Sequence, residues 1–197
     1  MEKVTINLPE SWGEVPIEQF QELSTYAGDS SILKAINIIA CLANVDNEII
    51  KTMSTEDLKN VTETLKWSSQ VPSSDFKHTL TIDGVEYSMV PKLNELTVGE
   101  WIDLDGYSDD FIANMHLIMA VLYRPLITVI NDKTRFIEKY DALKCIERAK
   151  LFREKVFVSE VYGAALFFLS IGVKFTSNLA IFLEEQSRKT ILEENRK

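Results

Sequence analysis

The chain has 197 residues, a formal net charge of -9 at pH 7 and an apolar fraction of 46%, which is ordinary for a globular protein. This length fits one domain or two small lobes, and the scarcity of glycine and proline argues against disorder. The acidic balance disfavours nucleic acid and anionic membranes as partners, because binding to phosphate groups rests on an excess of Lys and Arg.

The first third of the chain is predicted to be mostly helical. Pro16 suits the first turn of a helix that runs to about Tyr26. Ser54, followed by two acidic residues, is a capping signal for an amphipathic helix. The expected elements are a short strand over 4–8 and helices over 16–26, 31–43, 46–53 and 55–68.

A β-hairpin is the clearest prediction in the middle of the chain. Asp83-Gly84 separates two alternating runs, and this dipeptide is the strongest short hairpin signal because both turn positions tolerate positive φ. Thr97 and Glu100 form a capping box that starts the next helix. The expected elements are strands over 77–82 and 85–90, a helix from Thr97, a helix over 109–123, a second hairpin over 126–140, a helix over 141–156 and a long helix from 159 to about 195.

Together these elements predict a mainly α (α+β) fold, a helical bundle with one or two β-hairpins. The expected organisation is an N-terminal helical lobe over 1–70, followed over 71–197 by the hairpin and a second helical lobe with a long C-terminal helix. The two parts are expected to form one compact domain.

The first half of the chain also reads as an internal duplication. Residues 15–26 are echoed by residues 96–107, and in both copies an aromatic residue, Phe20 or Trp101, is followed by a leucine and a tyrosine. A strongly apolar helical segment follows each copy. A true duplication predicts that Phe20 and Trp101 are equivalent core anchors and that the two apolar helices pack as quasi-symmetric neighbours. Coincidence within a helical protein is the alternative.

The acidic run that begins at Asp103 superficially suggests a calcium loop. With Gly106 in the invariant sixth position of an EF-hand, the first and twelfth ligand positions fall on Trp101 and Ile112, which cannot bind calcium. The carboxylates are expected instead at the N-terminus of the following helix, where they interact favourably with free N–H groups. No metal or cofactor site is predicted.

An enzyme is an alternative whose best available cluster is His116 with Asp103, Asp109 and Asp110. A lone histidine in an apolar helix is, however, more often a packed residue than a catalytic one. The sequence has no glycine loop for phosphate, no nucleophile elbow and no paired-cysteine zinc spacing.

The two cysteines, Cys41 and Cys145, each lie in an apolar helical pattern and are expected to be buried thiols rather than nucleophiles. Two cysteines are too few for a disulfide scaffold and indicate a reducing compartment. The N-terminal residues lack the charged-then-apolar pattern of a secretory signal, so the expected location is the cytoplasm.

The C-terminal region carries two candidate functions. Residues 161–183 are long and apolar enough to span a bilayer, and a membrane-associated protein anchored here is an alternative. Lys174 near the middle costs about 2.5–3.5 kcal/mol on insertion scales, which favours a core helix. Beyond this segment, Ile191 and Leu192 are the candidate partner-binding residues of an otherwise charged helix end, which could dock in a partner's groove. A solvated helix end is the alternative.

A basic stripe falls on one side of the helix expected over 141–156, at Lys144, Arg148 and Lys155. Such a stripe could meet nucleic acid, but acidic residues interrupt it and the acidic total opposes it. A solvent-exposed face with ion pairs is therefore expected.

Several motifs, taken in order, resemble one class of protein. They are Pro9-x-Ser11-Trp12, Ile17-x-x-Phe20, Ile82-Asp83-Gly84-Val85-Glu86-Tyr87, Leu93-x-Glu95-Leu96-Thr97-Val98-Gly99-Glu100-Trp101-Ile102-Asp103-Leu104, His116 before Ala120-Val121-Leu122-Tyr123-Arg124-Pro125, and Gly163-Ala164-Ala165-Leu166-Phe167-Phe168. The series covers most of the chain and resembles small structural-module proteins of tailed bacteriophages, including crAss-like phages and their relatives. None of these motifs is a chemical signature.

The resemblance implies a non-enzymatic protein of virion morphogenesis, either a tail assembly chaperone or a minor virion component. It implies that the protein acts in the host cytoplasm during assembly and, in the second role, stays in the virion. The implied partners are phage structural proteins of the tail, portal or tape-measure kind, or another copy of the chain, with no nucleic acid and no membrane. The resemblance carries over no catalytic residues and no cofactor.

Overall fold

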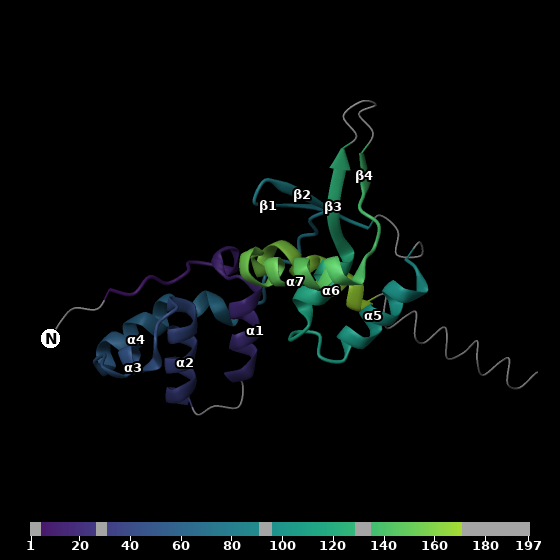
Figure 1. Cartoon of the computed structure of the whole chain (residues 1–197). Helices are drawn as coiled ribbons and strands as arrows, with labels where there is room; N and C mark the ends of the chain where they lie inside the picture. The colour runs from purple at the N-terminus through teal and green to yellow at the C-terminus, as the bar shows by residue number, and fades with distance from the viewer. Residues whose placement is uncertain (1–4, 27–30, 91–95, 129–134, 171–197) are drawn as a thin grey trace, which may run out of the picture.

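The computed structural model describes residues 5–26, 31–90, 96–128 and 135–170, and it confirms the predicted mainly helical α+β fold (Figure 1). Residues 158–170 are helical. The other elements, in chain order, are η1 (Trp12–Glu14), α1 (Ile17–Thr25), α2 (Ser31–Ala43), α3 (Asn47–Lys51), α4 (Thr55–Thr64), η3 (Lys66–Ser69), β1 (Thr79–Ile82), β2 (Val85–Met89), α5 (Val98–Ser108), α6 (Met115–Leu122), β3 (Tyr123–Thr128), β4 (Arg135–Ile137) and α7 (Ala142–Lys155), where η denotes a 3₁₀ helix.

The centre of the core is α6, a helix that is apolar on nearly every side. It packs chiefly against α7 and also contacts α5 and β3. On α7 the apolar residues Cys145, Ala149 and Phe152 are buried, whereas Ala142 is exposed. Each large apolar side chain removed from water contributes about 1.5–3 kcal/mol, so this centre supplies much of the stabilisation.

The sheet confirms the hairpin predicted at Asp83-Gly84. Its strands run antiparallel in the order β1-β2-β3-β4. Asp83 and Gly84 have φ values of 50° and 78°, the positive values that a two-residue hairpin turn requires. The second expected hairpin is confirmed by the pairing of β3 with β4, although its turn lies outside the described residues. One face of the sheet packs on α7 through Tyr87, whose ring lies edge-on to Phe152 at a centroid distance of 5.1 Å.

Residues 5–8 form no strand, contrary to prediction. Ile6 and Leu8 pack partly against the core. No described strand pairs with this segment, and without a neighbouring strand its N–H and C=O groups cannot form a ladder. The weak alternation of apolar and polar residues therefore reflects the partial burial of two side chains, and it does not indicate a strand.

The segment before α1 is tied instead to the junction between α7 and the helix over 158–170. The N–H of Ile17 donates to the Val156 carbonyl at 2.9 Å. The N–H of Val158 donates to the Val15 carbonyl at the same distance, which completes an isolated antiparallel bridge. Two segments far apart in sequence are thus joined through their backbones.

Helices α2, α3 and α4 form a layer on the far side of α1 from the sheet (Figure 1). The predicted cap of α4 is confirmed, because the N–H of Asp57 donates to Ser54 Oγ at 3.0 Å. The expected single helix over 55–68 is instead two pieces, α4 and η3, joined at the buried Leu65.

The capping box predicted at the start of α5 is confirmed. The Glu100 N–H donates to Thr97 Oγ1 at 3.3 Å, and the Thr97 N–H donates to Glu100 Oε2 at 2.6 Å. The helix then continues to Ser108, so Asp103 and Asp105 lie within α5. The expectation that they lie at the start of the next helix is wrong.

The helix expected over 109–123 is shorter than predicted, because α6 begins only at Met115. Residues 109–114 form turns. Asp110 does cap this turn, since its Oδ1 accepts a hydrogen bond from the Ala113 N–H at 3.2 Å. Local capping therefore explains this one carboxylate of the acidic run.

Phe20 and Trp101, the residues compared in the duplication hypothesis, lie in partly similar surroundings. Phe20 and Trp101 are both partly buried and both contact the helix over 158–170, Phe20 at Tyr162 (6.3 Å between centroids) and Trp101 at Phe168 (6.4 Å). The principal neighbours of α2 are α1, α3 and α4, whereas those of α6 are α7, α5 and β3. The two apolar helices are not paired, so the expectation of quasi-symmetric neighbours is wrong.

Candidate functional site

The candidate partner-binding residues Ile191 and Leu192 lie outside the described residues, as does Lys174. Of the apolar stretch over 161–183, only residues 161–170 are described. Four of these ten side chains are buried in the core: Val161, Ala164, Ala165 and Phe168. No helix in the described ranges is long and apolar enough to cross a membrane.

The cluster considered for an enzyme is not assembled around His116. The Nδ1 of His116 lies 2.9 Å from the side-chain amide of Gln21, which also donates to the backbone carbonyls of residues 112 and 113. The amide carries two N–H hydrogens for these three acceptors, and Nδ1 can accept one of them only as an unprotonated nitrogen. Burial, aided by the nearby Arg153, lowers the pKa of His116 and favours that unprotonated form.

The three aspartates of that cluster have separate roles. Asp103 accepts a hydrogen bond from the Tyr140 phenol, and Asp110 caps the turn before α6. Asp109 is the C-cap residue of α5. Within the described ranges, no group of three or more His, Cys, Asp or Glu side chains is arranged to hold a metal ion.

Both cysteines are buried, as expected, and are free thiols. Burial, with a smaller contribution from Glu22, raises the pKa of Cys41 to about 12. Burial likewise raises the pKa of Cys145. Since the thiolate is the nucleophile, both thiols are poorly suited to covalent catalysis at neutral pH.

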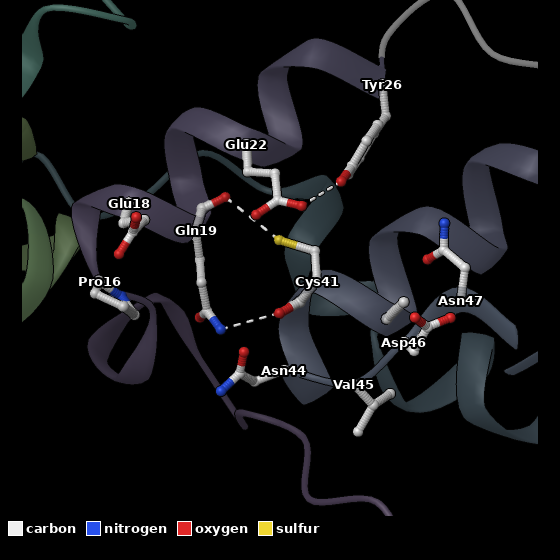
Figure 2. Close-up of a pocket in the computed structure, with 11 residues that line it drawn as sticks. Pro16, Glu18, Gln19, Glu22, Tyr26, Cys41, Asn44, Val45, Asp46 and Asn47 are labelled. Atoms are coloured by element: carbon white, nitrogen blue, oxygen red, sulfur yellow. Dashed lines mark hydrogen bonds between the residues drawn. The ribbon is translucent and has the colours of Figure 1, made fainter. Parts of the chain in front are cut away.

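A groove of about 690 Å³ lies between α1 and the end of α2 (Figure 2). Its polar lining includes Glu18, Glu22 and Asp46, yet each carboxylate is engaged within the molecule. Glu18 pairs with Arg153 at 3.3 Å, Glu22 accepts from the Tyr26 phenol, and Asp46 caps α3.

Figure 2 also shows that the walls of this groove are joined to each other. The Gln19 amide donates to the Cys41 carbonyl at 3.0 Å, and the Cys41 thiol donates to the Gln19 carbonyl at 3.7 Å. These contacts hold the end of α2 against α1. The groove is therefore a structural joint, and its acidic lining reflects capping and helix packing.

A second polar feature is a buried ion pair between α5 and β3. Glu100 is 2% exposed and Arg124 is 8% exposed. A guanidinium nitrogen of Arg124 lies 3.1 Å from Glu100 Oε1. Within the described part of the chain, Arg124 Nε and Glu100 Oε1 nevertheless have no hydrogen-bond partner, so the pair is not fully satisfied there. Burial, with a smaller effect from Arg148, lowers the pKa of Arg124, although Glu100 opposes that shift.

Arg148 corrects the expectation of a solvent-exposed basic stripe on α7. It is only 6% exposed, donates from Nε to the Ala120 carbonyl at 2.9 Å, and pairs with Glu138 at 3.4 Å. Lys144 and Lys155 are exposed as predicted, and they pair with Glu138 and Asp83 respectively. Arg148 thus faces α6 and β4, and only the two lysines belong to a solvated face.

A pocket of about 470 Å³ opens beside Arg124 where β2, β3 and β4 meet. Sequence reasoning missed this site entirely. One sequence feature could have indicated it. Arg124 is a charged residue that directly follows the most apolar helical segment, between Tyr123 and Pro125. The pocket is lined by Ser88, Val90, Arg124, Leu126, Arg135, Phe136, Ile137, Glu138 and Lys139.

Apolar side chains project into solvent on α5 and α7. On α5, Val98 and Ile102 are 77% and 66% exposed and lie one helical turn apart. On α7, Leu143 is 76% exposed and Ile146, three residues on, is also exposed. The Tyr140 phenol joins the two helices by its hydrogen bond to Asp103 of α5, close to the start of α7.

The comparisons with known proteins give no assignment. No family model, curated protein or solved structure matches this chain significantly.

Proposed function

We propose that this protein is a non-enzymatic bacteriophage morphogenesis protein that acts through protein–protein contacts, as a tail assembly chaperone or a minor virion component. The observation that carries the proposal is the pair of exposed apolar residues, Val98 and Ile102, on α5. Single exposed apolar residues are common on protein surfaces. A pair on one helix face is a better candidate for a partner contact, because covering it removes adjacent apolar area from water.

The family resemblance supports the same proposal and supplies the class of partner. The run from residue 93 to residue 104 is one of its motifs and contains both exposed residues. We infer that the partner is a phage structural protein of the tail, portal or tape-measure kind. The contact surface includes the exposed face of α5.

The test is affinity purification of the tagged chain from host cells that produce particles of the phage encoding it. The wild-type chain should retain a phage structural protein, identified by mass spectrometry, or co-sediment with particles. The double variant Val98→Asp with Ile102→Asp should lose most of this capture, because two charges would be buried at the contact.

A matched control adds the same charge elsewhere. Asn60→Asp with Thr62→Asp introduces two carboxylates at exposed positions of α4 and should leave the capture unchanged. Far-UV circular dichroism should show that both double variants fold. Capture that is equal in both double variants, or a wild-type chain that retains no phage structural protein, would refute the proposal.

A further inference from the structure

The pocket between β2, β3 and β4 combines apolar walls with cationic groups. Val90, Leu126, Phe136 and Ile137 supply the apolar part of the lining. A pocket of this composition suits a ligand with a charged end and an apolar or polypeptide body, rather than a bare inorganic ion.

The charge of the pocket is opposite in sign to that of the whole chain. Among the residues that the structure describes, three cationic side chains and one carboxylate line it. The described ion-pair partners of these groups are two carboxylates and two cations, whose charges cancel. The described groups therefore carry an excess of two positive charges, on a chain of net charge -9. The groups counted are Arg124, Arg135, Lys139 and Glu138 in the lining, and Glu100, Glu86, Lys144 and Arg148 as their partners.

Arg124 is only partly satisfied by its partner. It is more than nine-tenths buried, lies in the pocket lining, and has an Nε without a hydrogen-bond partner. Its ion pair with a described residue, Glu100, leaves Glu100 Oε1 without a hydrogen bond as well. Nε itself has almost no accessible surface, so an anion in the pocket would meet the part of the Arg124 side chain that lines it. Buried charged groups are normally paired and hydrogen-bonded, so that additional negative charge would lower the cost of burying Arg124.

Lys139 supplies a second cation at an exposed position two residues beyond β4. Its side chain makes no hydrogen bond or ion pair with any residue that the structure describes. Arg135, by contrast, is already held by Glu86 at 2.5 Å. Lys139 and Arg124 are therefore the two cations of the pocket with capacity for an incoming anion.

We propose that this pocket binds an acidic side chain of a partner polypeptide, with the carboxylate received by Arg124 and Lys139. Charge-assisted hydrogen bonds from Arg and Lys to carboxylate are the strong contacts such a site offers. The apolar walls then contact the neighbouring part of the partner. The inference rests on the proposed function in that it names the chemistry of the protein's partner.

The experiment titrates the full chain with the peptide acetyl-Ser-Glu-Leu-Glu-Ser-amide up to millimolar concentration and follows backbone amide resonances by NMR. Residues 135–139 should shift. The matched peptide with Gln in place of both Glu should bind at least about tenfold more weakly, because it lacks the charge.

Two variants locate the contact. Lys139→Glu should weaken peptide binding by at least about tenfold, whereas Lys139→Arg should retain it. Lys59→Glu, at an exposed lysine of α4, makes the same charge change and should leave binding unchanged. Arg124→Met should also abolish binding. Arg124 is buried, so this substitution can prevent folding, and in that case the exposed Lys139→Glu variant still tests the proposal.

Three outcomes would overturn the proposal. The first is the absence of shifts at residues 135–139, and the second is equal binding of the Glu and Gln peptides. The third is that inorganic phosphate shifts the same amide resonances as strongly as the Glu peptide does. The pocket would then be a general anion site. Any of these, together with continued capture of a phage protein, would leave the proposed function standing.

Discussion

The helices α6 and α4 show how differently the two halves of the molecule are held. α6 buries six of its eight residues, whereas α4 buries none. α6 lies among α7, α5 and β3, while the principal contacts of α4 are with α2 and η3. Stability is therefore concentrated in the α6–α7 centre, whereas α4 depends more on its helix cap and a few half-buried side chains. The four predictions below test this difference, from the largest expected effect to the smallest.

Gly163→Ala should be one of the two most damaging changes. A Cβ at this position would lie 2.5 Å from the backbone carbonyl oxygens of both Ser74 and Asp75. Neither obstacle is a flexible side chain, so the loop must separate from the helix over 158–170. We expect a loss of about 3 kcal/mol or more in the free energy of unfolding, measured by urea denaturation.

Gly106→Ala is the matched control. Gly106 lies in α5, and a Cβ there would meet no atom within 4 Å. We expect a gain of about 0.5–1 kcal/mol, since alanine favours the helix over glycine. A Gly163→Ala protein as stable as wild type would show that the loop is not packed as described.

Phe152→Ala tests the centre directly. Phe152 is fully buried in α7 and lies edge-on to Tyr87. Its truncation should cost about 3–5 kcal/mol in the free energy of unfolding. Leu143→Ala on the same helix removes a side chain that is 76% exposed and should stay within about 0.5 kcal/mol of wild type. Similar losses for both variants would contradict the buried and exposed faces assigned to α7.

The helix caps should differ between the two halves. Thr97→Ala removes the cap of α5 and a hydroxyl that contacts the buried Glu100, so we expect a cost of about 2 kcal/mol. Ser54→Ala removes only the exposed cap of α4 and should cost about 1 kcal/mol. Thermal melts of the two variants measure the difference, and an equal or reversed order would mean that the burial of Glu100 adds nothing to its capping role.

His116 should give the smallest effect, a pH dependence of stability. Its pKa is lowered in the folded protein, so the unfolded chain binds more protons as pH falls through its ordinary value near 6.5. The contribution of neutral His116 is therefore complete above about pH 6.5 and declines below it. Tm should fall slightly from pH 7.5 to 5.5, and His116→Gln should flatten that slope. An unchanged slope in the variant would place the titrating group elsewhere.

Local signals predicted much of the fold because each depends on a few adjacent residues. Asp83-Gly84 requires only its own positive φ values, and Thr97 with Glu100 satisfies N–H groups within one turn. The failures involve partners distant in sequence. Residues 5–8 alternate but have no strand beside them, and α2 and α6 resemble each other but pack against different neighbours.

The pocket beside Arg124 was not predicted from the sequence, because its residues are also brought together from distant parts of the chain. Arg148 has the spacing of a surface stripe, and only the packing of α7 against α6 shows that it points to the Ala120 carbonyl. Arg124 and Glu100 lie on different elements, so no sequence pattern indicates that they meet. A charge within the apolar run of α6 and β3 was the one clue that could have been weighed.

The backbone seam between residues 15–17 and 156–158 has a consequence for synthesis on the ribosome. Its two segments are separated by roughly 140 residues in the sequence. Contacts between residues so far apart form more slowly than local contacts. α1 can therefore be anchored at its N-terminal end only after α7 has emerged. Until then the apolar residues beneath it remain accessible to other chains, so the time taken to translate the intervening residues contributes to how long the nascent protein is exposed to misassembly.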